Sequence, residues 1–215
     1  MLGDVTEFCR LILLRHPELA PEHENVAIGS GSASLSRRGR ASVLHWLKVL
    51  EKVGVDRVFT SDQPQCSEPA VGMAEIKQAD LIQDQRLRDQ AMGRWQGRAW
   101  DDLMQEESGK VTTFFQDFGE TAAPEGESLG QAVERMLNWW TDVSPQGAGR
   151  TLAVVTSGAM LTGFAAAMLG MRLSRCVSLN LPHGGIGILE LFANGARIAT
   201  WNPDALVEVK SGLDS

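Results

Sequence analysis

The feature that most constrains the fold is the alternation of short apolar runs with longer segments of helical periodicity. The runs at 8–14 (FCRLILL) and 151–156 (TLAVVT) are almost entirely apolar, as strands buried on both faces of a sheet are. Over 35–53 and 129–143 apolar residues recur at three- and four-residue spacing, which is the pattern of amphipathic helices. Alternating strands and helices predict a mainly parallel sheet with helices on both faces.

The other segments complete this pattern. Further strands are predicted at 57–60, 81–82, 176–180, 185–192 and 197–201, and further helices at 64–77, 100–118 and 160–169. Asn194-Gly195 is a two-residue turn signal that joins the last two strands in a hairpin. The predicted fold class is α/β: a three-layer α/β/α sandwich whose mainly parallel sheet carries an antiparallel hairpin at one edge.

Composition narrows the class of protein. The 215 residues are 43% hydrophobic and 22% charged, without a long linker, so we expect one domain over 1–215. The net charge of -7 argues against nucleic acid or an anionic membrane as a partner. The acidic N-terminal stretch does not resemble a signal peptide, and no apolar segment is long enough to span a bilayer. Three widely spaced cysteines without a ligand cluster indicate a cytoplasmic protein, and we expect neither metal nor cofactor.

Polar side chains stand where three predicted strands end. Arg15-His16 follows the first strand, Ser61-Asp62 follows the second, and Ser157-Gly158 follows the strand at 151–156. In open α/β sheets, ligands bind beyond the carboxyl ends of the strands. The sequence therefore predicts one site that gathers these three pairs.

The pair Arg15-His16 suits phosphoryl chemistry. A guanidinium fork matches phosphate oxygens, and the adjacent imidazole titrates near neutrality. The competing interpretation is an exposed loop histidine beside a surface arginine. Two other motifs are weaker evidence for a site. Ser157 lacks the glycines that stand two residues before and two residues after the serine of a nucleophile elbow. Gly29-Ser30-Gly31 does not follow a strand, which favours a loop.

An ordered series of motifs covers nearly the whole chain. The motifs are LILLRHP, LSRRGRA, FTSDQPQCSEPA, LRDQAMGRWQGRAWDDL, PEGES and VVTSGAM. In this order they resemble the histidine phosphatase superfamily, and GRWQGRAWDDL, the R-H-P tripeptide and the LPHGG turn are most similar to its α-ribazole phosphatase branch. The resemblance implies a phosphoglycerate-mutase-like fold.

The resemblance also implies a two-step reaction. His16 would attack the phosphorus of a monoester to form a phosphohistidine, and Arg15 would hold the phosphoryl oxygens. Asp89 stands where the family usually carries a glutamate that protonates the leaving oxygen, so the carboxyl function is kept on a side chain one methylene shorter. The alternative for Asp89 is a solvated loop carboxylate.

Two positions depart from the family pattern. Gln65 replaces the second phosphate-binding arginine, and Ser157 replaces the second histidine, so two cationic partners of the phosphate are missing. Ser61 at the strand end and His183 in the LPHGG turn complete the predicted substrate-binding residues. His183 lies on a segment that approaches the site in the family, and it is a candidate replacement for the missing imidazole; the alternative is an ordinary loop histidine.

The sequence thus predicts a protein that binds the phosphate monoester of a small metabolite at Arg15 and His16, with weak or lost hydrolysis. One alternative is an active phosphatase of altered mechanism, similar to α-ribazole-5'-phosphate phosphatases. Another is a regulatory protein that binds a phospholigand without turnover. A phosphoglycerate mutase is less favoured, because returning a phosphoryl group to a product requires a fully cationic pocket.

Overall fold

The sheet occupies the centre of the molecule, in a computed structural model that describes residues 8–117 and 119–203. Its strands are β1 (Cys9–Arg15), β2 (Arg57–Thr60), β3 (Asp80–Gln83), β4 (Thr151–Thr156), β5 (Ile186–Phe192) and β6 (Gly195–Trp201), in the spatial order β3-β2-β4-β1-β5-β6. The first four are parallel, whereas β5 and β6 run antiparallel to their neighbours. The predicted mainly parallel sheet with an antiparallel edge hairpin is confirmed.

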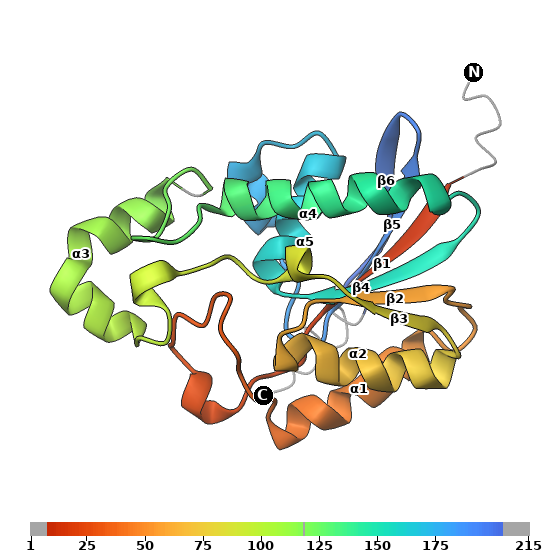
Figure 1. The fold of residues 1–215 in the computed structure, drawn as a ribbon, viewed down its shortest axis with the longest axis horizontal. Coiled ribbons are helices and arrows are strands. Elements are labelled where there is room, and N and C mark those ends of the chain that lie inside the picture. The colour runs from red at the N-terminus through yellow and green to blue at the C-terminus, as the bar shows by residue number, and fades with distance from the viewer. Residues whose placement is uncertain (1–7, 118, 204–215) are drawn as a thin grey trace, which may run out of the picture.

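Helices cover both faces of this sheet (Figure 1). Helices α1 (Arg37–Val49) and α2 (Pro64–Lys77) lie on one face, and α4 (Leu129–Val143) and α5 (Gly158–Met168) lie on the other. Helix α3 (Trp100–Gln116) stands off at one end. Short 3-10 helices at 21–23, 85–87, 93–95, 144–146 and 173–178 occupy connections. The three-layer sandwich is therefore confirmed.

Strand β1 shows why the apolar runs are continuous. Leu11 and Leu13 pack into the core beneath α4 and α5, whereas Ile12 and Leu14 pack into the core beneath α1 and α2. All four side chains are fully buried. A strand covered on both faces needs apolar residues at every position, which removes the polar alternation of an exposed sheet.

Helix α3 packs with neighbouring loop residues into a small core that is separate from the two cores of the sheet. The buried residues of this small core are Ala27, Trp95, Leu103, Val111, Phe114 and Ala123. The helix bends at Glu107, whose backbone angles are not helical (φ -133°, ψ 34°). The Glu107 carboxylate pairs with Lys110 at 2.6 Å and accepts a hydrogen bond from the indole of Trp95 at 3.3 Å. The predicted end of this helix, Phe118, lies outside the described residues.

The predicted strand at 176–180 is wrong, because 173–178 forms a 3-10 helix. Leu173, Cys176 and Leu179 recur every third residue and pack together against α4 and α5, whereas Val177 is 58% exposed. A three-residue repeat places side chains on one face of a 3-10 helix. The apolar and β-branched residues that suggested a strand thus follow a different period.

Helix α1 is shorter than the predicted 35–53. It begins after Ser36, whose hydroxyl accepts a hydrogen bond from the Gly39 amide at 2.8 Å, and it ends at Val49.

The three cysteines are free and buried. No helix within the described ranges has the length and apolar character needed to cross a membrane.

Candidate active site

The ends of β1 and β4 bring two of the predicted positions together. The two strands are parallel neighbours with Arg15 opposite Thr156, so His16 and Ser157 follow at the same edge of the sheet. The His16 amide donates to the Thr156 carbonyl at 3.0 Å, which continues the ladder by one residue. The His16 side chain is buried, with 6% of the residue exposed.

The ring of His16 is set up as a neutral base. Its Nδ1 lies 2.9 Å from the Pro17 carbonyl oxygen, and a carbonyl only accepts, so Nδ1 carries the ring proton. Burial lowers the pKa of His16 to about 3, which the nearby His183 and Arg15 reinforce. Among the described residues Nε2 has no hydrogen-bond partner. Its lone pair is consequently available at neutral pH.

Arg15 is held by two acceptors on the loop before β5. Its Nη1 donates to the Leu181 carbonyl and its Nη2 donates to Nε2 of His183, both at 2.7 Å. Its buried Nε has no partner within the described ranges. The guanidinium lies against Gly158, where a Cβ atom would come within 2.9 Å of Nε. A glycine at 158 therefore makes room for the arginine.

His183 lies beside His16, with the two ring centroids 5.1 Å apart. The loop that carries it is tied down: the Gly184 amide lies 3.2 Å from the carbonyls of both Arg15 and His16, and the Trp46 indole donates to the Gly184 carbonyl at 2.6 Å. His183 is an exposed residue, but desolvation around its ring, with the charge of Arg15, lowers its pKa to about 4.

Asp89 approaches from the segment before α3 and meets Ser157. Its Oδ1 accepts hydrogen bonds from the Ser157 hydroxyl at 2.6 Å and from the Gln90 amide at 2.8 Å. Burial raises the pKa of Asp89 despite these bonds and the charges of Arg15 and Arg135. Because Oδ1 already accepts two hydrogen bonds, the proton of the neutral acid belongs on Oδ2, which has no partner in the described part of the chain.

Ser157 also caps helix α5. It has extended backbone angles at the N-cap position, and its hydroxyl oxygen faces the Met160 amide at 3.5 Å. The amides of Gly158 and Ala159, in the first turn, have no backbone acceptor among the described residues. The first turn of a helix presents such N–H groups together with a partial positive charge. The site thus has the weakly positive end of a helix beside Ser157.

Two residues that the sequence did not single out position the acid. Oε1 of Gln63 accepts a hydrogen bond from the Asp89 amide at 2.8 Å. Nε2 of the same side chain donates to the carbonyls of Gly29 and Gly31 at 3.0 and 2.8 Å. Arg135 pairs with Glu127 and donates to backbone carbonyls of the 86–89 segment. A glutamine before a helix and a helical arginine are common, so neither gives a distinctive local signal.

Gln65 and Ser61 lie deeper than the rim. Both ends of the Gln65 amide are 3.0 Å from loop backbone atoms, the Ala33 amide and the Gly31 carbonyl, and the residue is 3% exposed. Ser61 is fully buried, and its hydroxyl faces Gln63. In this arrangement both side chains support the loop at 29–33, and their contact with substrate stays a prediction.

A pocket of about 150 Å³ is lined by residues that neighbour Asp89 and Ser157 in the chain. Gln90, next to Asp89 in the chain, and Ala159, two residues after Ser157, both line it. Its other lining residues are Met92, Trp100, Phe114, Phe115, Gly119, Thr121 and Leu129. None of these side chains is charged, so the pocket suits an apolar or aromatic group.

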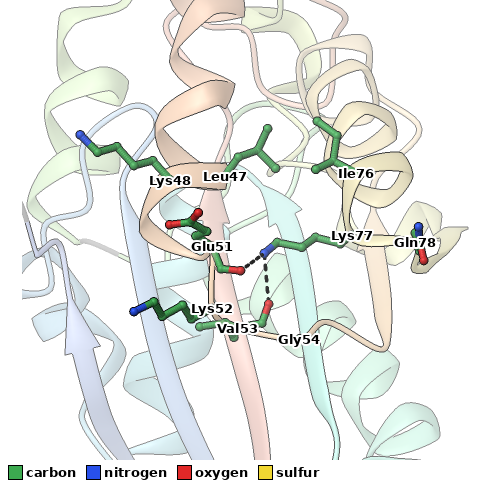
Figure 2. A pocket seen from close by; sticks show the side chains of 9 residues that line it. All are labelled: Leu47, Lys48, Glu51, Lys52, Val53, Gly54, Ile76, Lys77 and Gln78. Carbon is green, nitrogen blue, oxygen red and sulfur yellow. Dashed lines mark hydrogen bonds between the residues drawn. The ribbon is translucent and has the colours of Figure 1, made fainter.

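A larger pocket of about 700 Å³ lies between the C-terminal ends of α1 and α2 (Figure 2). Lys77 reaches into it and donates to the carbonyls of Leu50, Glu51 and Val53, which ties the turn that follows α1 to the end of α2. The chain passes from this pocket into the start of β2, so the pocket lies at the amino ends of the parallel strands. It is remote from His16, and Lys77 stabilises a helix end there.

No three His, Cys, Asp or Glu side chains of the described ranges gather as a metal site requires. The residues that the structure does bring together are Arg15, His16, Asp89, Ser157 and His183. Their arrangement offers a neutral imidazole, a guanidinium held by two acceptors and a carboxyl whose pKa is raised, around one edge of the sheet. Such a set can bind an anion, donate a proton and attack an electrophile.

The chain is similar to known proteins in sequence and in fold. The chain is 27% identical over 165 residues to a probable phosphoglycerate mutase GpmB of Cronobacter sakazakii, covering 75% of each protein. It is 25% identical to a glucosyl-3-phosphoglycerate phosphatase of Mycolicibacterium vanbaalenii, covering 95% of this chain and 92% of that one. The α-ribazole phosphatase of Shigella flexneri has a similar fold, with a TM-score of 0.83, 21% identity and coverage of 91% and 97%.

The chain also matches the model of a protein family. Residues 11–204 match the histidine phosphatase superfamily (branch 1), a span that contains every predicted site residue. The fold, the order of the motifs and this match lead to one conclusion: the chain belongs to branch 1 of the histidine phosphatase superfamily.

Proposed function

We propose that this protein is a slow phosphomonoesterase that uses His16 as its nucleophile. The observation that carries the proposal is the pairing of a neutral His16, whose Nε2 is free of hydrogen bonds among the described residues, with a carboxyl whose pKa is raised. A nucleophile and an acid in opposite protonation states are what the first step needs.

In that step the Nε2 lone pair of His16 forms a bond to phosphorus, and the bond from phosphorus to the leaving oxygen breaks. The proton on Oδ2 of Asp89 moves to that oxygen, which departs as an alcohol. The Asp89 carboxylate then takes a proton from water as the water oxygen attacks phosphorus. The phosphohistidine bond breaks, phosphate leaves, and both residues return to their first state.

The low rate follows from the shortage of cations. Arg15 lies at the edge where phosphate would bind, but the Gln65 amide is engaged by the 29–33 loop, and Ser157 is neutral. A hydrogen bond to a charged group contributes about 1.5–3 kcal/mol. Losing two such partners removes about 3–6 kcal/mol, or roughly two to four powers of ten in rate. The free amides of α5 offset part of this loss.

The substrate that fits best is an apolar or aromatic phosphomonoester. Gln90, the residue after the proposed acid Asp89, lines the 150 Å³ pocket, and the lining residues carry no charge. A leaving group with its own carboxylate or second phosphate would meet no cation there. An α-ribazole-5'-phosphate phosphatase-like activity is the alternative within the same chemistry.

A second function, binding a phospholigand without turnover, is favoured by the Ser157 bond to Asp89 at 2.6 Å. That bond occupies one carboxyl oxygen and fills the position where the family places a histidine. In this case the site would hold an ester whose leaving oxygen never meets the acid.

The test is a substrate panel that includes 1-naphthyl phosphate, α-ribazole 5'-phosphate, 3-phosphoglycerate and phosphoserine. Wild type and His16→Ala are compared, because the variant reveals contaminating phosphatase. We expect slow turnover with naphthyl phosphate that His16→Ala abolishes, and a phosphohistidine trapped by rapid quench. Binding without His16-dependent turnover would establish the second function instead, and neither binding nor turnover would refute both.

A further inference from the structure

The hydrogen bond between Arg15 and His183 fixes the state of the histidine. A guanidinium has only donors, so the His183 Nε2 atom that lies 2.7 Å from Nη2 must accept, and its ring proton must sit on Nδ1. Protonating Nε2 would place an N–H against an N–H. The bond and a positive charge on His183 are therefore mutually exclusive, whatever the pH.

The same ring lies where a phosphoryl group would come. His183 is 5.1 Å from His16 between ring centroids, and it is exposed, so it lies at the solvent side of the nucleophile. Arg15 from β1 and His16 from the following loop are the titratable groups shown in contact with it, and the charge of Arg15 disfavours a further positive charge on His183. A bound dianion has the opposite effect, because its negative charge favours the protonated ring of His183.

We propose that His183 is a proton-dependent phosphate ligand that takes the place of the cation missing at Ser157. In the empty site its neutral ring accepts from Arg15 and holds the guanidinium. When a dianionic phosphoryl group enters, the Nε2 lone pair takes a proton from solvent and releases Arg15 Nη2. The imidazolium Nε2–H and the freed Nη2–H then both donate to oxygens of the anion. This inference rests on the proposed phosphate site at Arg15 and His16.

Two consequences distinguish this arrangement from a permanent cation. Binding of a dianion near pH 6.5 takes up about one proton, and the Kd weakens by as much as tenfold per pH unit above the pKa of free His183. The low pKa of the free residue, about 4, leaves the ring uncharged in the empty site at that pH. A site built from arginines would show neither effect.

The experiment uses sulfate, a dianion that does not titrate between pH 5 and 8. Calorimetry at pH 6.5 in two buffers of different ionisation enthalpy counts the protons taken up, and Kd is measured across the pH range. His183→Gln keeps an amide oxygen that can accept from Arg15 but cannot titrate. His23→Gln is the matched control, because His23 bonds Ser34 in a different loop. Imidazole ¹⁵N shifts of wild type report the protonation of His183 directly.

We expect about one proton per sulfate in wild type and His23→Gln, none in His183→Gln, and a Kd in that variant that no longer depends on pH. Sulfate binding without proton uptake, or uptake that survives in His183→Gln because the proton goes to His16, overturns the inference and leaves the proposed phosphatase intact. If wild type binds no sulfate, the inference also fails. The proposed function is then decided separately, by the turnover that His16→Ala should abolish.

Discussion

The two halves of the candidate site are built in different ways. On the acid half, Asp89 is held by Ser157, by Gln90 and by the Gln63 side chain, and Arg135 fixes the carbonyls of the segment that carries it. On the nucleophile half, within the described part of the chain, the Arg15 guanidinium has two protein acceptors and an unpartnered Nε, and one of the acceptors is a titratable ring.

This difference separates two tasks. Moving a proton to a leaving oxygen requires a carboxyl held in one place, and a network of fixed partners provides that preorganisation. Holding a phosphoryl group with few cations requires donors that can turn from the protein to the ligand. We infer that the acid half governs the departure of the leaving oxygen, whereas the nucleophile half governs how firmly the phosphoryl group is held, both in the bound substrate and in the transition state.

The largest effect should come from Asp89→Asn, which removes the proton and keeps the shape. With an alkyl phosphate kcat should fall by about 10²–10⁴. With 4-nitrophenyl phosphate it should fall far less, because nitrophenolate departs without a proton. The two losses are measured against Asp101→Asn, an exposed carboxyl in the first turn of α3.

The pH profile of the same proteins sharpens this prediction. A general acid works while protonated, so wild-type kcat should be high at low pH and fall as the pH rises through the raised pKa of Asp89. His16, with its pKa lowered to about 3, should cause no loss between pH 5 and 7. Equal losses of Asp89→Asn on both substrates would contradict its role as the acid.

A smaller effect is expected for Gln63→Leu, which breaks the bonds from Gln63 to Asp89 and to the 29–31 loop. Unpaired buried groups should lower stability by about 1–3 kcal/mol, seen as a lower Tm. We expect kcat on the alkyl ester to fall by about tenfold and the Kd for sulfate to stay within twofold, since this residue acts on the acid half alone. A Kd that weakens as much as kcat falls would remove the separation of the two halves.

The smallest effect should come from Gly158→Ala. The new Cβ atom would lie 2.9 Å from Nε of Arg15, so the guanidinium must move away from the site. Sulfate affinity should weaken by about three- to tenfold, with little change in Tm. Gly72→Ala is the matched control, because nothing lies within 4 Å of its added Cβ in α2. Unchanged affinity in Gly158→Ala would show that Arg15 does not set phosphate binding.

The sequence predicted some elements closely because their signals are local. Helix α2 starts with Pro64 at its first position, and the apolar spacing over 129–143 matches the bounds of α4. The strand at 151–156 is apolar between its terminal threonines because it is covered on both faces. Each of these signals depends on neighbours within a few residues.

Contacts between distant segments could not be predicted in this way. Gln63 meets Asp89 26 positions further along the chain, and Arg15 meets His183 across 168 positions. The resemblance to a family placed His183 near the site, but it said nothing of the bond that fixes the state of the ring. The 3-10 helix at 173–178 was not predicted, because its apolar and β-branched residues are also typical of a short strand.

The separate core of α3 makes one part of the chain modular. Phe114 contributes both to that core and to the pocket beside the acid, and Met92 and Trp100 pack against the same core and line the same pocket. Substitutions there should leave the packing around the sheet unchanged, since distant sites contribute almost independently. Directed evolution toward a substrate with a different leaving alcohol should therefore first change residues in and around the α3 core such as Met92, Trp100 and Phe114. The sheet that presents His16 should keep its sequence.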